Sequence, residues 1–286
     1  MRSIRDALSQ DAALLGTTLT LTVAEARIEA QMLLQQALGV PRAWLLAHPE
    51  QMLEAGQQAA YDAMLQRRLQ GEPVAHILGE REFFGLSFKV TSATLIPRPD
   101  TELLVELALQ RIPPQGGFRV LDLGTGTGAI ALSIAHTRPD AEVVAVDASE
   151  AALAVARENA QRLAIRNVSI VQSDWFAALG TQRFDLIVSN PPYIAAGDEH
   201  LSQGDVRFEP MSALASGSDG LDDIRRIIAQ AHCFLERDAW LMFEHGYDQA
   251  QQVRDLLQQY GYGDVFSAKD IAGIERVSGG INSRIQ

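Results

Sequence analysis

Strand-like and helix-like segments alternate from residue 118 onward, and this alternation constrains the fold more than any other feature. Apolar runs typical of strands lie at 118–123, 141–147, 167–172, 184–190 and 239–245. Segments with helical spacing lie at 128–138, 149–164, 220–236 and 248–260, and two more strand-like runs follow at 263–270 and 275–285. This pattern is typical of α/β folds, in which helices cover both faces of a mostly parallel sheet.

The first 72 residues show helical spacing and no strand pattern. Thr22 is a candidate N-cap for a helix that Gly39 ends, and Pro41 suits the start of the next helix. The pair Arg67-Arg68 is interpreted as a solvated helix end. These residues are predicted to form a small all-α bundle with its own core.

The segment between the helices and the α/β region alternates apolar and other side chains from Phe84 to Val90, which predicts a β-hairpin linker. Pro97-Arg98-Pro99 ends it, and Asp100 or Thr101 is expected to cap a following helix. The predicted domains are a helical substrate-docking domain at 1–72, the hairpin linker at 73–98 and the α/β domain at 99–286.

The charge of the chain argues against a nucleic-acid partner. The 286 residues include 24 Lys and Arg against 36 Asp and Glu, a formal net charge of −12, and only two of the cations are lysines. Non-specific affinity for nucleic acids comes from cationic side chains that neutralise phosphates. We expect no direct nucleic-acid partner, although a local basic patch is compatible with this charge.

The remaining composition indicates a cytoplasmic protein. Cys233 is the single cysteine, so no intrachain disulfide can form. The N-terminus lacks the apolar core and cleavage site of a secretory signal, and no stretch is long and apolar enough to span a bilayer. The histidines lack the spacing of a zinc site. We therefore expect neither a membrane partner nor a bound metal.

The stretch "DLGTGTG" joins the first strand of the α/β region to its first helix. Its glycines, Gly124, Gly126 and Gly128, alternate with Thr125 and Thr127. Glycine lets a backbone approach a ligand closely, and a helix N-terminus offers unbonded N–H groups. The spacing differs from the dinucleotide fingerprint, which has two residues between its later glycines. The loop therefore predicts ligand binding without indicating a dinucleotide.

Polar and aromatic residues follow the next two strands. Asp147 ends the second strand, 19 residues after Gly128, where a carboxylate can accept hydrogen bonds from both hydroxyls of a ribose. Asp174 follows the third strand and can accept from an exocyclic amine, while Trp175 can contact an adenine face. An N-cap role for Asp147 and a core position for Trp175 are the alternatives. Their joint placement at successive strand ends favours a nucleoside site.

The fourth strand ends in Asn190-Pro191-Pro192-Tyr193. Asn-Pro marks turns in general, so a strand-ending turn is one interpretation. The other is a clamp for a planar amine or amide, because this tip belongs to the same sheet edge as the predicted nucleoside site.

Together, "DLGTGTG", the acid after the second strand and "SNPPY" resemble Rossmann-like, class I, S-adenosylmethionine-dependent methyltransferases. The tetrad resembles that of enzymes that methylate a nitrogen conjugated to a π system. "GEPVAHILGEREFFGLSF", "LIPRPDTELLVE" and "RFEPMSALASGSDGL" are similar to release-factor glutamine methyltransferases of the PrmC or HemK type. The resemblance covers nearly the whole chain, including the N-terminal helices.

The resemblance implies a cytoplasmic protein-(glutamine-N5) methyltransferase. It implies methyl transfer from S-adenosylmethionine, which becomes S-adenosylhomocysteine, to the glutamine of the Gly-Gly-Gln motif in class I peptide chain release factors. The implied cofactor contacts are Gly124, Thr125, Gly126, Thr127, Gly128, Asp147, Asp174, Trp175 and Asn190. The implied substrate contacts are Asn190, Pro191, Pro192 and Tyr193, of which Asn190, Pro191 and Tyr193 are assigned to catalysis.

Our hypothesis for the chemistry is that the Asn190 side-chain oxygen and the Pro191 carbonyl each accept one N–H of the substrate amide. Two fixed acceptors orient the nitrogen towards the methyl group. Tyr193 would pack its ring on the flat amide. Three alternatives are a ribosomal-protein glutamine methyltransferase, an adenine-N6 methyltransferase of DNA or RNA, and a non-catalytic cofactor-binding protein.

Overall fold

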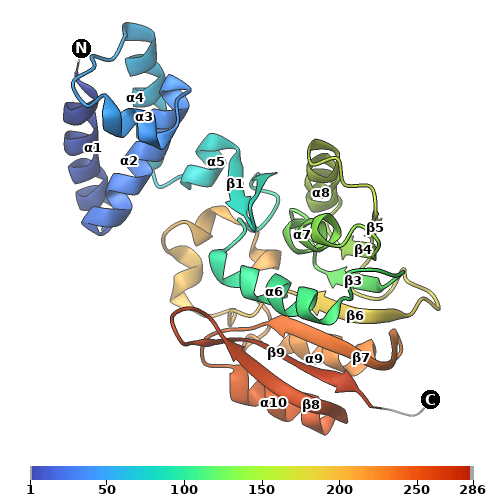
Figure 1. Cartoon of the computed structure of the whole chain (residues 1–286). Helices are drawn as coiled ribbons and strands as arrows, with labels where there is room; N and C mark the ends of the chain where they lie inside the picture. Colours follow the sequence, from blue (N-terminus) through green and yellow to red (C-terminus); the bar gives the residue numbers. More distant parts are fainter. Residues whose placement is uncertain (1, 284–286) are drawn as a thin grey trace. The chain divides into compact units, whose positions relative to one another are not determined.

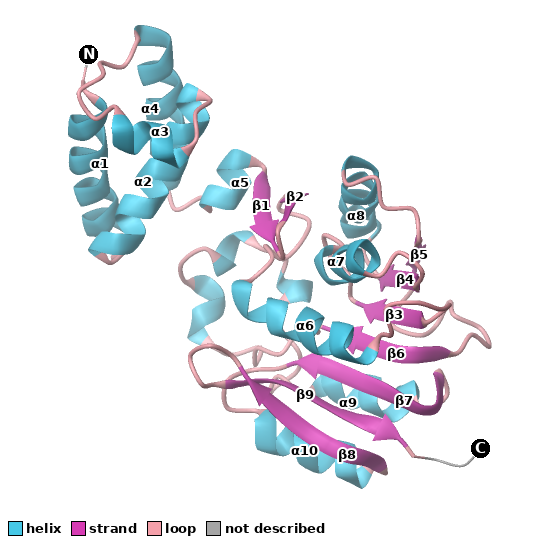
Figure 2. Ribbon diagram, viewed as in Figure 1, coloured by secondary structure: helices cyan, strands magenta, loops and turns pink. Residues whose placement is uncertain are grey.

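The α/β pattern folds into a seven-stranded sheet with the order β5-β4-β3-β6-β7-β9-β8 (Figures 1 and 2). The structure is a computed structural model that describes residues 2–283. Neighbouring strands from β5 to β7 pair in parallel, and β9 is antiparallel to both β7 and β8. The strands are β3 (Arg119–Leu123), β4 (Glu142–Asp147), β5 (Val168–Gln172), β6 (Phe184–Ser189), β7 (Leu235–Glu244), β8 (Tyr262–Lys269) and β9 (Glu275–Asn282).

Helices cover both faces of this sheet (Figure 1). Alternate residues of β4 belong to different cores: Val143 and Ala145 pack in the core with α6 and α7, whereas Val144 and Val146 pack in the core with α9 and α10. Burial of both faces explains why the strands are almost continuously apolar. The helices of this unit are α6 (Glu102–Arg111), α7 (Ala129–Thr137), α8 (Glu150–Arg162), α9 (Asp222–Ala231) and α10 (Ala250–Gln259).

The strand order places a topological switch point between β3 and β6. The chain proceeds from β3 through β4 to β5 and then returns to β6 on the other side of β3. Connections that diverge in this way leave a crevice at the carboxyl ends of the two strands, where open α/β sheets bind ligands. The predicted fold class is confirmed.

Helix α9 is shorter than the helix predicted at 220–236. It ends at Ala231, and Leu235 already pairs with Phe184 in the sheet. Tertiary pairing with β6 therefore overrides the helical spacing of these residues. Of the strand predicted at 275–285, Arg284 and Ile285 lie outside the described residues.

Two short strands form the predicted hairpin, β1 (Glu80–Phe83) and β2 (Leu86–Lys89). Phe84 and Gly85 in the turn both have positive φ, 52° and 76°, as tight hairpin turns require. Phe83 and Phe88 pack in the same core as α6 and α7. The hairpin is shorter than the predicted linker, because residues 74–78 are helical.

The N-terminal helices are α1 (Ile4–Leu19), α2 (Val23–Leu38), α3 (Arg42–Ala47), α4 (Ala55–Leu69) and α5 (Val74–Leu78). They enclose a separate core that includes Leu33, Leu34 and Tyr61. Thr22 forms a capping box at the start of α2, and Gly39 ends that helix with φ 65°, as predicted.

Within the described residues, the chain divides into one unit that runs up to Glu80 and includes Ser202–Phe208, and a second unit formed by Arg81–Leu201 and the residues from Glu209 onward. The domain boundaries proposed from the sequence at residues 72 and 98 stay predictions.

Arg68 ties the segment Ser202–Phe208 to the helical unit. Its Nε donates to Glu29 at 2.7 Å, and one terminal nitrogen donates to Asp205 at 2.8 Å. Only 3% of the Arg68 side chain is exposed, so its interpretation as part of a solvated helix end was wrong. The buried guanidinium is instead neutralised by two carboxylates from distant parts of the chain.

Candidate active site

A cavity of about 300 Å³ lies at the carboxyl ends of β3, β4, β5 and β6. Its wall also includes residues of the segment 93–101, before α6, and of the segment 210–213. Of the residues predicted for the site, it is lined by Gly124, Thr125, Gly126, Thr127, Asp147, Asp174, Trp175, Asn190 and Pro192. Gly128, Pro191 and Tyr193 are not part of the lining.

The glycine loop is bonded to the end of β4. The amides of Gly124 and Thr125 both donate to the carbonyl of Val146 at 2.9 Å. Gly128 has φ 83°, and a Cβ on it would lie 2.9 Å from Leu132 Cδ1. Only glycine therefore fits at this turn into α7 without displacing a neighbour. Gly128 contributes to the site through the path of the backbone.

Asp147 lines the cavity and also organises the loop. One carboxylate oxygen accepts from the Gly126 amide and the other from the Ser149 amide, both at 2.9 Å. A carboxylate oxygen can accept more than one hydrogen bond. Both oxygens therefore keep acceptor capacity for a ligand while they hold the loop.

Trp175 and Asp174 are fixed by partners that the sequence pattern does not indicate. Trp175 has φ 51°, and its carbonyl accepts from the Ser173 hydroxyl at 2.7 Å. A Cβ on Gly124 would lie 3.5 Å from the Trp175 ring, so the ring lies beside the glycine loop. Both carboxylate oxygens of Asp174 accept from Arg226, at 2.9 and 2.8 Å. The predicted amine acceptor is therefore an ion-paired group at the cavity wall.

Asn190 follows β6 and lines the cavity. Its Nδ2 donates to the hydroxyl oxygen of Thr101 at 3.2 Å. Because the amide nitrogen is engaged there, Oδ1 is the end that can accept a bond from a ligand. Thr101 occupies the N-cap position of α6, one of the two predicted positions, but its backbone angles are helical and its side chain makes no capping bond. Its hydroxyl oxygen accepts from Asn190 instead.

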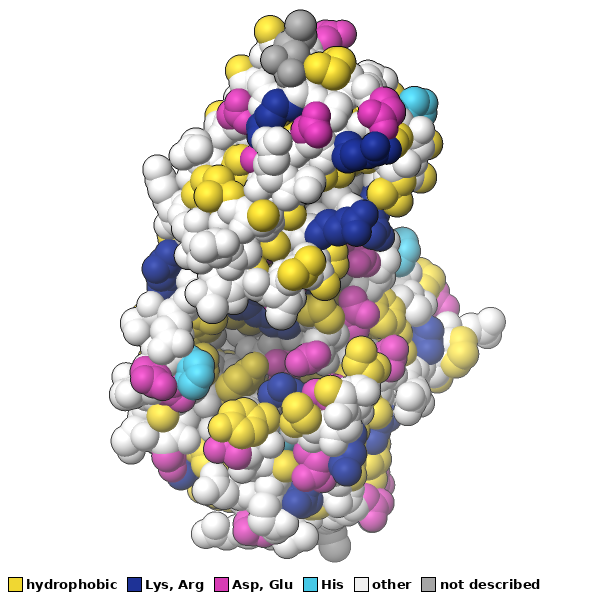
Figure 3. All heavy atoms as spheres, turned by 90° about the vertical axis from the view of Figure 1, so that its left-hand side faces the viewer, with side chains coloured by type: hydrophobic (Ala, Val, Ile, Leu, Met, Phe, Trp, Pro, Cys, Tyr) yellow, Lys and Arg dark blue, Asp and Glu magenta, His cyan; other side chains and the backbone are white. Residues whose placement is uncertain are grey.

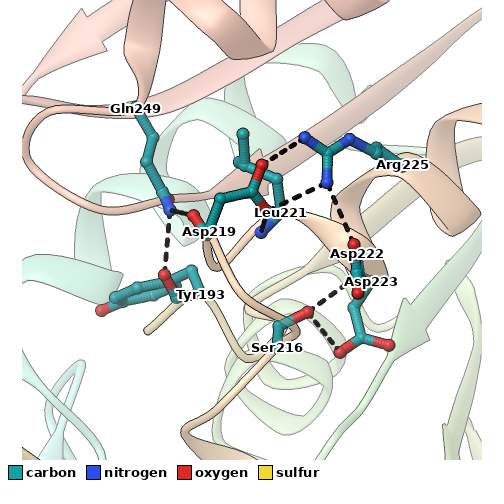
Figure 4. A network of polar contacts seen from close by, with 8 residues as sticks. All are labelled: Tyr193, Ser216, Asp219, Leu221, Asp222, Asp223, Arg225 and Gln249. Atoms are coloured by element: carbon teal, nitrogen blue, oxygen red, sulfur yellow. Dashed lines mark hydrogen bonds and ion pairs between the residues drawn. The ribbon is translucent and has the colours of Figure 1, made fainter. Parts of the chain in front are cut away.

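Tyr193 is held at both ends by residues that end or follow β7. Its hydroxyl donates to Glu244 Oε1 at 3.0 Å. Its carbonyl accepts from Gln249 at 2.9 Å, as Figure 4 shows. A Cβ on Gly220 would overlap that carbonyl, so the approach requires glycine. Burial raises the pKa of Tyr193. Tyr193 is not among the residues that line the cavity, so its predicted contact with a substrate stays a prediction.

An ion pair fastens two segments of the cavity wall. One terminal nitrogen of Arg98 donates to both oxygens of Glu209 at 2.8 Å. The Glu209 side chain is fully buried, and Arg98 lines the cavity together with Pro210, the residue after Glu209. The motifs "LIPRPDTE" and "RFEP" drew attention to these two segments in the sequence. Nothing in the sequence indicated that Arg98 and Glu209 form an ion pair.

Asp122, the last residue but one of β3, is a buried carboxyl group beneath the glycine loop. Its Oδ2 accepts from the Thr125 hydroxyl at 2.6 Å, and Oδ1 has no partner at full hydrogen-bonding geometry among the described residues. Burial raises the pKa of Asp122 to about 7, and nearby Asp147 adds to this, while the Thr125 hydroxyl and the Ala131 amide act in the opposite direction. The folded protein therefore keeps this carboxyl protonated to a higher pH than an ordinary aspartate.

The raised pKa of Asp122 predicts that the folded protein loses stability as pH rises. Its pKa is higher in the folded protein than its ordinary 3.8. The unfolded chain therefore loses the proton first, and the contribution present below pH 3.8 is lost as pH rises through about 7. The asparagine in Asp122→Asn cannot ionise. We therefore expect this variant to lose less stability than the wild-type protein as pH rises, with a difference of a few kcal/mol at most. The measurement is urea unfolding of both proteins at about pH 5 and about pH 8. An equal loss in both proteins would contradict the assignment.

The described residues contain neither a metal-binding cluster nor a helix that could span a membrane. Across residues 2–283, no three His, Cys, Asp or Glu side chains come together as a metal site would require. No helix within this range has the length and apolar character needed to cross a membrane.

Comparisons with known proteins agree with this fold. A family model described as the methyltransferase small domain matches residues 99–207, and one described as the PrmC N-terminal domain matches residues 12–79. A solved structure of the 16S rRNA N2 G1207 methyltransferase RsmC from T. thermophilus, in complex with AdoMet and guanosine, is similar with a TM-score of 0.50. It is 24% identical and covers 71% of this chain and 49% of that chain, so it supports the fold alone.

The sheet, the glycine loop and the tetrad at the switch point define a Rossmann-like methyltransferase. The release factor glutamine methyltransferase of Bordetella pertussis is 54% identical over 255 residues, 89% of this chain and 94% of the relative. That of Escherichia coli is 51% identical over 252 residues, 88% of this chain and 91% of the relative. The chain belongs to the release factor glutamine methyltransferase family. The resemblance inferred from the sequence motifs is confirmed.

Proposed function

We propose that this chain transfers a methyl group from S-adenosylmethionine to the N5 nitrogen of the glutamine in the Gly-Gly-Gln motif of class I peptide chain release factors. The observation that supports the proposal most strongly is the hydrogen bonding of Asn190 at the cavity. Its amide nitrogen is engaged by Thr101, which leaves its oxygen as an acceptor at the wall of the cavity. An acceptor of this kind suits a substrate that presents an N–H on a planar nitrogen.

The residues at the cavity fit S-adenosylmethionine as the methyl donor. Asp147 offers acceptor capacity for ribose hydroxyls, and Trp175 offers an aromatic surface beside the glycine loop. The cavity of about 300 Å³ is in the size range of small-molecule sites. Asp174, oriented by Arg226, is our candidate for the exocyclic amine of adenine.

In this reaction the main task of the protein is to orient the substrate amide towards the methyl group. The bound donor supplies an electrophilic methyl group: a nitrogen–carbon bond forms, the carbon–sulfur bond breaks, and the sulfur keeps the electron pair as S-adenosylhomocysteine forms. Asn190 Oδ1 and the Pro191 carbonyl each accept one N–H, which directs the face of the amide nitrogen to the methyl carbon. Drawing both hydrogens towards acceptors raises the electron density on nitrogen. The surplus proton passes to water after transfer, when the nitrogen is acidic.

The charge distribution favours a protein substrate over a nucleic acid. On the face shown in Figure 3, Asp and Glu side chains are interspersed with the Lys and Arg side chains. The formal net charge of −12 opposes the phosphate contacts that a DNA or RNA methyltransferase needs. We further propose that the N-terminal helical unit docks the release factor. Support comes from its match to the PrmC N-terminal domain at residues 12–79.

The test is transfer of a labelled methyl group to four purified acceptors: an intact class I release factor, a short peptide containing Gly-Gly-Gln, ribosomal proteins and DNA. We expect labelling of the intact factor at the glutamine, located by mass spectrometry. We expect kcat/KM for the peptide to be lower, because the peptide lacks the surface that the helical unit would contact.

The control is a release factor whose motif glutamine is replaced by alanine, and it should stay unlabelled. Labelling of ribosomal proteins alone would assign the chain to the ribosomal-protein alternative. Labelling of DNA alone would favour the adenine-N6 alternative, and cofactor binding without any transfer would favour a non-catalytic protein. Each of these three results would reject the proposal.

A further inference from the structure

The residues that line the cavity include two arginines, Arg98 and Arg226. Both terminal nitrogens of Arg226 donate to Asp174, at 2.9 and 2.8 Å. In Arg98 only Nη2 is engaged, and it donates to both oxygens of Glu209 at 2.8 Å. The Nη1 and Nε groups of Arg98 make no hydrogen bond at full geometry within residues 2–283. Arg98 therefore keeps one whole terminal nitrogen for a ligand.

The carboxylates that pair with the two arginines differ in their position. Asp174 lines the cavity beside Arg226, so an anion that approached Arg226 would also meet this carboxylate. The Glu209 side chain is fully buried and is not part of the lining, so a ligand meets the Arg98 guanidinium and not its partner. A carboxylate removed from water needs a cation and hydrogen bonds. Arg98 supplies both, the Ile96 amide donates at 3.4 Å, and Glu209 in return holds the guanidinium at the wall.

Arg98 belongs to the side of the cavity that holds the tetrad. Its carbonyl accepts from the Thr101 amide at 3.1 Å, and the Thr101 hydroxyl oxygen accepts from Asn190 Nδ2 at 3.2 Å. Asn190 follows β6, whereas Asp147 ends β4 and Trp175 comes after β5. In the strand order β5-β4-β3-β6, these two groups of residues lie on opposite sides of β3 (Figure 2). The cavity therefore has an adenosine side, with Asp147 and Trp175, and a tetrad side, with Arg98.

The covalent structure of S-adenosylmethionine places its amino-acid part beyond the sulfur, away from the ribose. A donor with its ribose at Asp147 and its methyl group towards the tetrad therefore needs a partner for its α-carboxylate on the tetrad side. Three acids line the cavity, Asp147, Asp174 and Asp223, so a further carboxylate enters a site with an excess of acidic groups. Among the lining residues, Arg98 is the cation on the tetrad side, and arginine binds carboxylates through charge-assisted hydrogen bonds.

We propose that Arg98 binds the α-carboxylate of S-adenosylmethionine through the N–H groups that Glu209 leaves free. Glu209 is a positioning residue, because it acts on the cofactor only through the guanidinium that it holds. The inference rests on the proposed function for the methyl donor, and it does not depend on which macromolecule receives the methyl group. It assigns a partner to the end of the cofactor that Asp147, Asp174 and Trp175 do not contact.

The experiment measures what the carboxylate contributes to binding. S-adenosylmethionine and its decarboxylated form share the adenosine, the sulfonium and the amine, and they differ only in that group. Calorimetric titration of the wild-type protein with each compound gives a ratio of two affinities. We expect S-adenosylmethionine to bind on the order of 10- to 100-fold more tightly than the decarboxylated compound, the usual effect of a hydrogen bond to a charged group.

Arg98→Gln should bring this ratio close to one, with little change in the affinity for the decarboxylated compound. Because this variant leaves the Glu209 carboxylate buried without a cation, the double variant Arg98→Gln, Glu209→Gln is measured beside it. We expect the same low ratio in both. Glu209→Gln alone keeps the guanidinium, and its amide oxygen can still accept from Nη2, so this variant should retain most of the preference for S-adenosylmethionine. Thermal unfolding checks that each variant is folded.

Arg226→Gln is the matched control, because it removes the other arginine of the same cavity. Arg226 is bound to Asp174 on the adenosine side. Its loss should weaken the binding of both compounds by similar factors and leave their ratio unchanged. If the net charge of the cavity alone favoured the carboxylate, Arg226→Gln would lower the ratio as much as Arg98→Gln, and this result would overturn the inference.

The other outcomes separate this inference from the proposed function. A wild-type ratio near one, or an unchanged ratio in both variants that lack Arg98, would overturn the inference even if the release factor were methylated. A ratio that fell as far in Glu209→Gln as in Arg98→Gln would make the ion pair only a brace of the wall and would also overturn it. A protein with an Arg98-dependent ratio that labelled no release factor would reject the proposed substrate and leave the carboxylate site standing. A wild-type protein that bound neither compound would reject both.

Discussion

Asn190→Ala is expected to lower kcat for methyl transfer by about 10²- to 10³-fold, the usual cost of removing one preorganised hydrogen-bonding group from an active site. Asn190 lines the cavity and its Nδ2 donates to Thr101, which leaves Oδ1 as the acceptor for a ligand. Alanine removes the acceptor, so the substrate amide would keep only the Pro191 carbonyl as a partner. Orientation of the nitrogen towards the methyl group is then lost.

The measurement is single-turnover methyl transfer to an intact release factor, together with calorimetric titration of S-adenosylmethionine. Thermal unfolding of the variant is the control for folding. Asn190→Asp keeps an acceptor oxygen, and we expect it to fall between alanine and the wild-type protein. Near-normal turnover of Asn190→Ala with the cofactor still bound would reject the assigned role of the tetrad.

Asp147→Ala is expected to weaken binding of S-adenosylmethionine about 100-fold. A hydrogen bond to a charged acceptor contributes about 1.5–3 kcal/mol, and we assign ribose hydroxyls to this carboxylate. The same substitution also releases the amides of Gly126 and Ser149. The loss of affinity therefore combines two missing acceptors with a loosened glycine loop.

The matched control for Asp147 is Asp140→Ala. Asp140 is an exposed residue shortly before β4, at the opposite end of that strand from Asp147. Calorimetric titration should show unchanged affinity for Asp140→Ala and a strong decrease for Asp147→Ala. If both variants bound S-adenosylmethionine like the wild-type protein, Asp147 would be only a structural acceptor for the loop amides.

Local patterns in the sequence were enough to predict the fold class and the general location of the site. Strand-like and helix-like periods, the glycines at 124–128 and the residues at successive strand ends depend on near neighbours in the chain. Parallel strands bring their carboxyl ends to one edge of a sheet, so a correct strand pattern also brings Asp147, Trp175 and Asn190 together. Most of the cofactor contacts inferred from the family motifs line the cavity for this reason.

Local sequence patterns could not predict contacts between residues that are far apart in the chain. Thr101 and Asn190 are 89 residues apart, Arg98 and Glu209 are 111 apart, and Arg226 meets Asp174 across 52 residues. Helical or strand periodicity contains no information about such pairs, because it describes only local backbone geometry. Thr101 was even interpreted as a possible helix cap, the role that its local surroundings favour.

The sequence by itself therefore determined the order of elements, the ligand-binding edge and the family to which the chain belongs. Only the tertiary structure decided how the tetrad is held. It turned Tyr193 towards Glu244, set the Asn190 amide against Thr101 and buried Asp122 beneath the glycine loop. The reason is physical: burial forces polar groups to find partners wherever the fold brings them close, and those partners come from any part of the chain.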